Sequence, residues 1–408
     1  MQIIDGGVTA AAGFEAASYA AGIKYQDHPD MALVYSTVPC RVAGTFTSNV
    51  VKAAPVQWDR RIVQAGTPVQ AVVVNTGFAN AGTGAEGLAI CETEARAAAE
   101  ALGLDNPDSV LIGSTGVIGG RLPMDRIRAG IEALAASRAH TKEAGTAASK
   151  AIMTTDTRNK EIAVSLEIGG KTVTLGAMSK GSGMIHPNMC TMLCYICTDA
   201  AISKELLQKA LSADILDSFN LITVDGDTST NDTVLLLANG LAGNPEISSE
   251  GADYDAFCEA LRTVTQSLAR RMAGDGEGAT ALIECRVEGA ADKQAARTLA
   301  RSVVGSQLVK AAVFGHDANW GRILCALGYA GVSFDPLQVD IALADGSEEF
   351  CLCRGGVAAD YSEERATELL GREEVVILAR MHQGEAAATA WGCNLTLDYV
   401  KINADYRS

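Results

Sequence analysis

Thr191 is the residue of this sequence whose type and position could do the most distinctive chemistry. It lies in KGSGMIHPNMCTML, residues 180–193, after a loop that contains Gly181 and Gly183 and before an apolar run. A threonine hydroxyl is a weak nucleophile, but the α-amine of an N-terminal threonine can serve as its base because the ordinary pKa of that amine is about 7.7–8.0. The small Cys190 and the backbone freedom of the two glycines would allow the bond before Thr191 to break. The segment is therefore a candidate for self-cleavage between Cys190 and Thr191, although glycine-rich loops before strands are also common in uncleaved proteins.

The elements around this segment would fix a new N-terminus in a sheet. Residues 161–179 alternate in polarity on both sides of Gly169-Gly170, which predicts a hairpin directly before the loop. The apolar run 191–200 predicts a strand that begins at Thr191 itself. A strand at this place would hold the new terminus rigidly in a sheet.

The rest of the chain alternates helices and strands. Apolar residues at helical spacing predict helices, the third of them capped by Ser203, over residues 89–104, 124–137, 203–219, 254–274 and 320–331. Apolar runs predict strands over residues 70–77, 279–290 and 307–315, and residues 109–119 predict a strand that runs into a glycine turn. Because both halves of the chain contain both kinds of element, we expect an α/β fold whose sheets are covered by helices.

Composition limits the partners of the protein. The 408 residues include 33 Lys and Arg against 49 Asp and Glu, a formal net charge of −16, which argues against a nucleic acid or an anionic membrane as partner. No apolar run approaches the roughly 18 residues that span a bilayer. The first residues, MQIIDGGVTAAAG, lack the basic region of a signal peptide, so we expect a cytoplasmic protein.

The cysteines and acidic motifs do not have the spacing of metal sites. The chain has 11 cysteines, which we interpret as reduced thiols. The CxxC of Cys194 and Cys197 and the CxC at residues 351–353 have no nearby histidine or second pair at zinc-finger spacing, so core packing explains them better. DGDTSTND, residues 225–232, starts like a calcium loop but has Thr230 where that loop needs glycine. We therefore predict a polar turn there, and no metal.

Two other motifs could suggest a catalytic histidine and a nucleotide-binding loop, but the sequence does not favour either role. His186 precedes Pro187 in the loop, and we expect it to hold the loop by hydrogen bonds because Thr191 would supply its own base. GDGEGAT, residues 274–280, is glycine-rich but lacks the order of a nucleotide-binding loop.

The whole chain resembles the ornithine acetyltransferase family, the glutamate N-acetyltransferases of arginine biosynthesis. KGSGMIHPNMCTML is similar to the processing site of that family. Further motifs resemble the family in its order: GGVTAAAGFEAASYAAGIK, TSNVVKAAPV, NTGFANAGTG, GSTGVIG, IMTTDT, VDGDTSTNDTV, GDGEGATALIE, GHDANWGRI and NADYRS. One such motif could be coincidence, but the ordered set is specific.

The resemblance implies a fold, an activity and an assembly. The fold would be a layered α/β sandwich like that of self-processing amidohydrolases with an N-terminal nucleophile, followed by a C-terminal α/β domain. Cleavage would leave an α chain, 1–190, and a β chain, 191–408, and the processed enzyme would be a dimer of αβ pairs. Thr191 would take the acetyl group of N-acetylornithine and pass it to glutamate. No cofactor is implied, while acetyl-CoA could serve as a second acetyl donor.

The resemblance also implies the site residues. An oxyanion hole is expected at Thr115 and Gly116, where a glycine turn after a strand could aim a backbone N–H beside a hydroxyl. Substrate contacts are implied at Thr154, Lys180, Thr191, Glu277, Asn403 and Ser408. The first of these could instead be Thr155. Lys180 and Glu277 suit a substrate that carries a carboxylate and an ammonium group, although the sequence does not say which end each would meet.

The chain departs from the family pattern at several positions. Cys190 replaces the usual alanine before the nucleophile; it is equally small, but its thiol is a rival nucleophile. Gly82 stands where a cysteine is expected, and Phe78 where a small polar residue is usual. Ser408 replaces a terminal threonine and keeps the hydroxyl. None of these changes removes a proposed catalytic group.

Two other functions remain open at this point. A related self-processing amidohydrolase or aminopeptidase would use water in place of glutamate as the acyl acceptor. A binding protein without enzyme activity would stay uncleaved.

Overall fold

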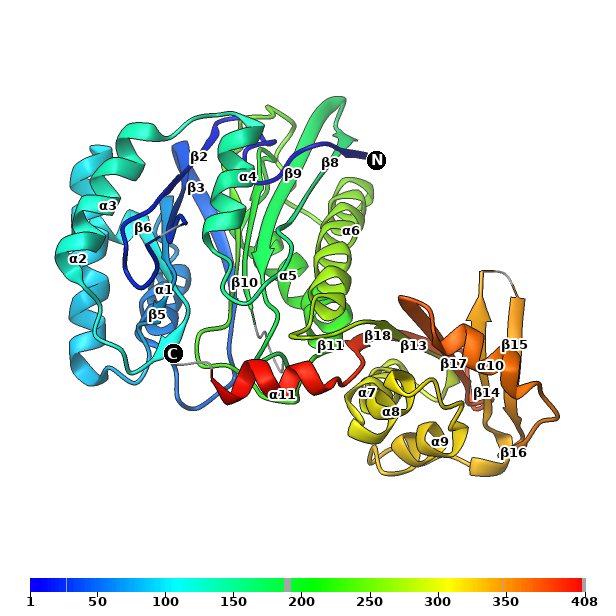
Figure 1. Cartoon of the computed structure of the whole chain (residues 1–408). Helices are drawn as coiled ribbons and strands as arrows, with labels where there is room; N and C mark the ends of the chain where they lie inside the picture. The colour runs from blue at the N-terminus through cyan, green and yellow to red at the C-terminus, as the bar shows by residue number, and fades with distance from the viewer. Residues whose placement is uncertain (27, 187–191, 347, 406–408) are drawn as a thin grey trace. The chain divides into compact units, whose positions relative to one another are not determined.

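The computed structural model describes residues 1–26, 28–186, 192–346 and 348–405 (Figure 1). The described residues form two compact units. The first contains those of Met1–Gly181, Asn188–Leu216 and Thr228–Leu268, and the second those of Ser182–Pro187, Asp217–Asp227 and Ala269–Ser408. The units do not coincide with the proposed α and β chains, because each of the two chains would contribute described residues to both units. The division at residues 190 and 191 stays a prediction about chemistry.

The long strand β3 joins the two parts of the sheet in the first unit. β3 pairs with β2 and β4 along its first half and with β12 along its second half. The hydrogen-bonded order is β1 (Gln2–Ile4), β8 (Lys160–Ile168), β9 (Lys171–Lys180), β10 (Leu193–Thr198), β12 (Thr233–Ala238), β3 (Met31–Phe46), β4 (Val69–Asn75) and β6 (Val110–Ser114), with β2 (Phe14–Tyr19) beside β3. A separate two-stranded sheet joins β5 (Phe78–Ala79) to β7 (Val117–Ile118). The expected hairpin is present as β8 and β9, and β10 pairs antiparallel with β9.

Strands β2, β3, β4, β6, β10 and β12 of the first unit contribute to a shared hydrophobic core. Every residue of β10 is buried, as is every residue of β6. The fully buried Tyr195 of β10 reaches β6, where a Cβ on Gly113 would lie 2.1 Å from the tyrosine oxygen. Gly113 therefore allows two parts of the sheet to pack closely around one aromatic ring.

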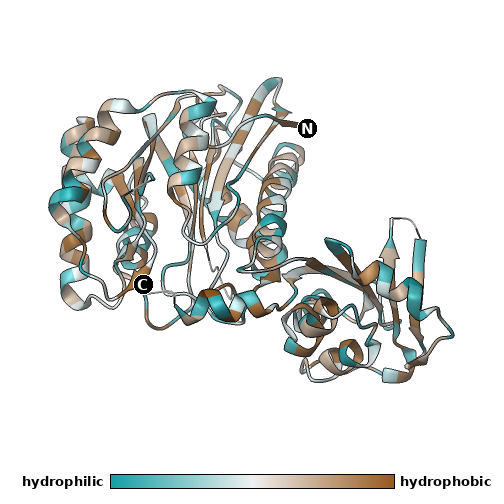
Figure 2. Ribbon diagram, in the orientation of Figure 1, coloured by the Kyte–Doolittle hydropathy of each residue, from teal (hydrophilic) through white to brown (hydrophobic). Residues whose placement is uncertain are grey.

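Helices cover the strands of this unit, and Figure 2 shows both hydrophilic and hydrophobic residues along them. They are α1 (Ala54–Ala65), α2 (Gly84–Leu102), α3 (Met124–Ser137), α4 (Lys142–Ala151), α5 (Lys204–Asp214) and α6 (Ala252–Gly274), whose last residues belong to the second unit. Ser203 caps α5 by accepting a hydrogen bond from the backbone N–H of Leu206, as predicted. Gly103 ends α2 in the left-handed conformation.

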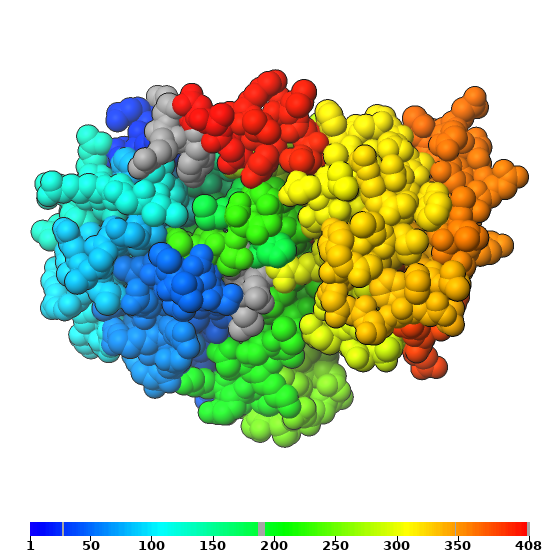
Figure 3. All heavy atoms as spheres, turned by 90° about the horizontal axis from the view of Figure 1, so that it is seen from below, coloured from blue at the N-terminus to red at the C-terminus, as the bar shows by residue number. Residues whose placement is uncertain are grey.

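The second unit is a seven-stranded sheet with helices. The strand order is β11 (Ile222–Thr223), β18 (Ala386–Cys393), β13 (Leu282–Ala290), β17 (Glu374–Arg380), β14 (Asp340–Asp345), β15 (Glu348–Arg354) and β16 (Val357–Ala358). The helices are α7 (Lys293–Gly305), α8 (Gln307–Phe314), α9 (Trp320–Gly328), α10 (Glu363–Leu370) and α11 (Leu397–Ala404). Figure 3 shows α7, α8 and α9, in yellow, gathered on one face of this unit. Short 3-10 turns occupy Pro107–Ser109, Ile215–Asp217, Phe219–Leu221 and Pro336–Gln338.

The α/β prediction is confirmed, but one predicted strand is wrong. Of residues 307–315, Gln307–Phe314 form the helix α8 rather than a strand, and Gly315 is its C-cap. The polarity of so short an apolar run does not distinguish a helix from a strand. Ser306 favours the helix because its side chain caps it by accepting a hydrogen bond from the backbone N–H of Val309. Among the described residues, no helix is long and apolar enough to cross a membrane.

Candidate active site

The predicted oxyanion residues form a tight turn after β6. The parallel strands β4 and β6 end side by side, with Asn75 opposite Ser114. The backbone N–H of Thr115 donates to the carbonyl of Asn75 at 3.1 Å, and that of Val117 donates to the carbonyl of Gly77 at 3.0 Å. Both neighbours of Gly116 are thereby fixed.

Only glycine fits at position 116. Its φ is +125°, and a Cβ there would lie 2.4 Å from the carbonyl oxygen of Gly77. Within the described part of the chain, the N–H of Gly116 has no hydrogen-bond acceptor. The turn therefore presents one unused backbone donor next to the hydroxyl of Thr115, which are the two donors that an oxyanion hole needs.

Lys180 lies at this turn, although it is 65 residues from Thr115 in sequence. It is the last residue of β9 and is 8% exposed. Its Nζ donates to Oγ1 of Thr115 at 3.4 Å, a long hydrogen bond. The structure thus brings together an expected oxyanion donor and an expected substrate contact.

Two buried carboxyl groups, those of Asp156 and Asp232, complete the surroundings of Lys180. Burial favours the neutral form of each, and the positive charge of Lys180 opposes this. For Asp156 the charges of Lys180 and Lys160 prevail, and its pKa is lowered. For Asp232 burial prevails, and its pKa lies well above the usual value. The two carboxyl groups near Lys180 therefore have pKa values that are shifted in opposite directions.

Sequence reasoning missed both of these acids. The motifs IMTTDT and VDGDTSTNDTV were noted only for a threonine, for the family resemblance or for a likeness to a calcium loop. The backbone N–H of Thr154 lies 3.2 Å from Oδ2 of Asp156, and a substrate contact at Thr154 or Thr155 stays a prediction. Each acid lies in one of these motifs, but nothing in the sequence says that either lies near Lys180.

In the second unit, the structure brings Glu277 and Asn403 together. Nδ2 of Asn403 donates to Oε2 of Glu277 at 2.7 Å, and the Glu277 side chain is buried. The backbone N–H of Glu277 donates to the carbonyl of Ser182 at 3.1 Å. A Cβ on Gly183 would lie 2.3 Å from the Glu277 carboxylate, so Gly183 makes room for this side chain.

The segment 182–186 is more constrained than predicted. The carboxylate of Asp225 accepts hydrogen bonds from the backbone N–H groups of Met184 at 2.6 Å and Ile185 at 2.9 Å. Neither Gly181 nor Gly183 has a positive φ, whereas Met184 has a φ of 54°. Gly183 is needed here for space and Asp225 fixes the backbone, so the expected role of the two glycines in allowing cleavage stays a prediction.

His186 takes the structural role that we expected. Its Nδ1 lies 3.0 Å from Oγ1 of Thr223. Burial, together with the charge of Arg301, lowers the pKa of His186 to about 4, so the ring is neutral at pH 7. A neutral ring held by a threonine fits a positioning role in this segment.

Three predicted residues, Cys190, Thr191 and Ser408, lie outside the described residues. Their predicted roles as cleavage position, nucleophile and substrate contact stay predictions.

The remaining motifs have structural roles. Asp225 serves the polar turn predicted for residues 225–232, and no group of three metal-binding side chains occurs in the described ranges. Cys194 and Cys197 are buried in β10, and burial raises the pKa of the Cys197 thiol. All cysteines in the described ranges are free thiols.

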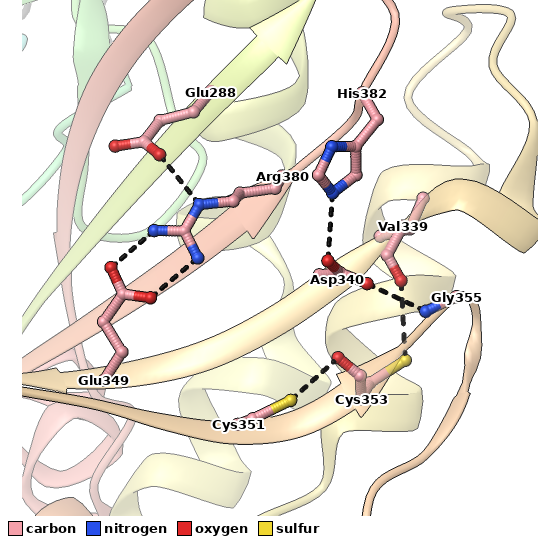
Figure 4. A network of polar contacts seen from close by, with 9 residues as sticks. All are labelled: Glu288, Val339, Asp340, Glu349, Cys351, Cys353, Gly355, Arg380 and His382. Carbon is pink, nitrogen blue, oxygen red and sulfur yellow. Dashed lines mark hydrogen bonds and ion pairs between the residues drawn. The ribbon is translucent and has the colours of Figure 1, made fainter.

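The CxC cysteines belong to a polar network of the second unit (Figure 4). The thiol of Cys353 points to the carbonyl of Val339, and that of Cys351 to the carbonyl of Cys353. In the same network Arg380 of β17 joins Glu288 of β13 to Glu349 of β15, with its Nε 3.1 Å from the first carboxylate and its Nη1 2.7 Å from the second. This network ties strands together and contains none of the predicted site residues.

Comparisons with known proteins agree on one family. The ArgJ family matches residues 15–408. The arginine biosynthesis bifunctional protein ArgJ of Symbiobacterium thermophilum is 55% identical over 410 residues, covering 100% of both chains. ArgJ 1 of Clostridium acetobutylicum is 49% identical, covering 97% of this chain and 96% of its own. The crystal structure of ArgJ from Bacillus halodurans matches with 47% identity and a TM-score of 0.50, over 52% of this chain and 99% of that chain.

Proposed function

The chain belongs to the ArgJ family, and from this membership we propose that it moves the acetyl group of N-acetylornithine to glutamate through an acetyl-threonine intermediate. The hydroxyl of Thr191 attacks the acetyl carbon, and the threonine α-amine takes the hydroxyl proton and passes it to the departing amine of ornithine. The C–N bond breaks and leaves an acetyl ester on Thr191. The amine of glutamate then attacks this ester, and N-acetylglutamate departs as the hydroxyl regains its proton.

The same threonine prepares itself for this work. Its hydroxyl attacks the carbonyl of Cys190, the peptide bond gives way to an ester, and water hydrolyses the ester. Cys190 becomes a C-terminal carboxylate and Thr191 gains its free amine. The solved Bacillus halodurans chain, which is matched over almost its whole length by about half of this sequence, has the length relation that such a cleavage produces.

The observation that carries the proposal is the turn at Thr115 and Gly116. Each half-reaction and the cleavage pass through a tetrahedral intermediate whose oxygen carries negative charge. The hydroxyl of Thr115 and the N–H of Gly116 are adjacent donors, and the ammonium group of Lys180 adds a positive charge at this turn. These groups suit an oxyanion.

The substrate contacts divide by charge. Lys180 suits a substrate carboxylate, and the pair of Glu277 and Asn403 suits an ammonium group. Thr154 or Thr155 and Ser408 would orient the substrate by hydrogen bonds. The proposal includes a dimer of αβ pairs in the cytoplasm and acetyl-CoA as a second donor to glutamate.

Release of ornithine tests this function. Purified protein is incubated with N-acetylornithine, with and without glutamate, and ornithine and N-acetylglutamate are measured. Release that requires glutamate, with one N-acetylglutamate for each ornithine, supports the transferase. Release that ignores glutamate would identify a hydrolase, and no release from either mixture would favour a binding protein.

A further inference from the structure

One buried carboxylate, that of Asp156, links the segment 154–160 to the residue that follows β9. Its Oδ1 accepts hydrogen bonds from Nζ of Lys160 at 2.7 Å and from the backbone N–H of Gly181 at 2.7 Å. Its Oδ2 accepts from the backbone N–H of Thr154 at 3.2 Å. Asp156 therefore connects the segment after α4, the first residue of β8 and the residue after β9.

The Asp156–Lys160 pair lies in the interior, where an ion pair needs a reason. The side chains of Asp156 and Lys160 are 0% and 1% exposed. Removing two charges from water costs about as much as their attraction returns, so stability alone does not account for such a pair. The position of the pair gives a reason for it. Asp156 accepts hydrogen bonds from the backbone of Thr154, an expected substrate contact, and of Gly181, which follows Lys180, another expected contact.

Asp156 also acts on Lys180 through charge. Burial alone would raise the pKa of Asp156, but the charges of Lys180 and then Lys160 outweigh burial, so the group is ionised at neutral pH. Lys180 follows Ser179, which pairs with Lys160 in the ladder of β8 and β9. The two lysines thus lie on adjacent strands with one carboxylate between them.

The ammonium group of Lys180 decides how Thr115 can use its hydroxyl. A protonated lysine has donors only, so in the 3.4 Å contact Oγ1 of Thr115 must accept. The single hydroxyl hydrogen of Thr115 is then left to donate to another group. A substrate oxyanion is the acceptor that the proposed reaction provides.

We propose that Asp156, held by Lys160, is a positioning residue that keeps the ammonium group of Lys180 on Thr115 and so commits the Thr115 hydroxyl to the oxyanion. This inference rests on the proposed function. If Lys180 only bound substrate, self-cleavage would not need it, because no substrate takes part in that step. The inference instead predicts that Asp156 and Lys160 support both self-cleavage and acetyl transfer.

The test needs a variant that folds. Asp156→Asn alone leaves Lys160 buried and uncompensated, which is strongly destabilising. The double variant Asp156→Asn with Lys160→Met removes both charges and keeps the side-chain volumes similar. Asp199→Asn is the matched control, because buried Asp199 accepts hydrogen bonds from Thr174 at 2.7 Å and Ala12 at 3.0 Å, and Thr174 lies toward the other end of β9.

The readouts are melting temperature, the rate of self-cleavage in a cell-free synthesis reaction, and kcat and KM of the cleaved enzyme. We expect the double variant to melt near the control, with cleavage and kcat each slowed about tenfold and KM for both substrates changed less than threefold. The control should keep wild-type rates.

Three results would overturn the inference. If the double variant cleaves and turns over like the wild type, Asp156 does not position the site. If only KM rises, Lys180 serves the substrate alone. If the control loses the same activity as the double variant, the effect belongs to β9 in general. A wild-type protein that neither cleaves nor transfers acetyl groups would instead overturn the proposed function, and the inference with it.

Discussion

The proposed oxyanion hole depends on two hydrogen-bond donors, the hydroxyl of Thr115 and the backbone N–H of Gly116. Oγ1 of Thr115 accepts a hydrogen bond from Lys180, and the backbone N–H of Thr115 donates to the carbonyl of Asn75. The hydroxyl hydrogen of Thr115 is therefore its one donor left for a substrate. The neighbouring Gly116 offers a backbone N–H that no change of side chain can remove. The two donors therefore differ in how they can be tested.

Replacement of Thr115 by alanine should slow acetyl transfer by about 10²–10³, because one oxyanion donor is lost. Thr115→Ser keeps the hydroxyl and should retain activity within about tenfold. The measurement is kcat for ornithine release from N-acetylornithine with saturating glutamate. Equal rates for Thr115→Ala and the wild type would remove the hydroxyl from this role.

The residue types of the site could be predicted from sequence, but their contacts could not. The motifs around Thr115, Lys180, Glu277 and Asn403 were sufficient to select these residues, and the structure places them in two pairs. Asp156 was missed because its importance lies in its distance to Lys160 and Gly181. Such distances follow from the pairing of β8 with β9, which no local pattern states.

At the scale of helices and strands, the sequence predicted most elements, but not the detailed roles of the turns between them. Periodicity predicted the hairpin of β8 and β9, the all-buried β10 and the ends of α3. It failed at α8, a short apolar run in which a capping serine outweighs the strand preference of valine. It also could not separate a glycine that needs a positive φ, such as Gly116, from one that needs space, such as Gly183.

Gly116→Ala should damage both stability and activity. The new Cβ would meet the backbone oxygen of Gly77 at 2.4 Å, and backbone cannot move aside as a side chain can. We expect a loss of roughly 2–4 kcal/mol in the free energy of unfolding and a large fall in kcat.

Gly119→Ala is the matched control for this change. Gly119 has a φ of 76° and nothing within 4 Å of an added Cβ, so only the left-handed strain remains, about 1–2 kcal/mol. Denaturant unfolding and turnover of both variants are compared. The steric account of the turn is wrong if the two variants behave alike.

At the scale of the whole molecule, the first unit has a core that contains ionisable groups. Glu94 of α2 is 3% exposed, and its Oε1 has no hydrogen-bond partner within the described ranges. Burial raises its pKa from 4.5 to about 8. Asp59, also buried, has its pKa raised for the same reason. The protein therefore folds with protons that the unfolded chain would release.

Stability should consequently fall as the pH rises through this window. Between pH 4.5 and about 8 the unfolded Glu94 is ionised while the folded one keeps its proton, so the folded state binds more protons. The loss from this group is at most about 1.4 kcal/mol per pH unit. Glu94→Gln should remove its share of the slope.

Denaturant unfolding at about pH 5 and about pH 8 measures this effect. Glu92→Gln is the control, because Glu92 lies on the same helix with an exposed side chain paired to Arg96. The wild type and Glu92→Gln should lose stability toward pH 8, and Glu94→Gln should lose less. Parallel curves for all three would contradict the assignment.

The central claim is that this chain cuts itself to create its nucleophile, and intact mass with N-terminal sequencing of the purified protein tests it most directly. We predict two chains, the second beginning Thr-Met-Leu-Cys, and a single uncut chain for Thr191→Ala, which should also lack acetyl transfer. An undivided wild-type chain of 42.4 kDa that is active, or normal turnover by Thr191→Ala, would contradict the account.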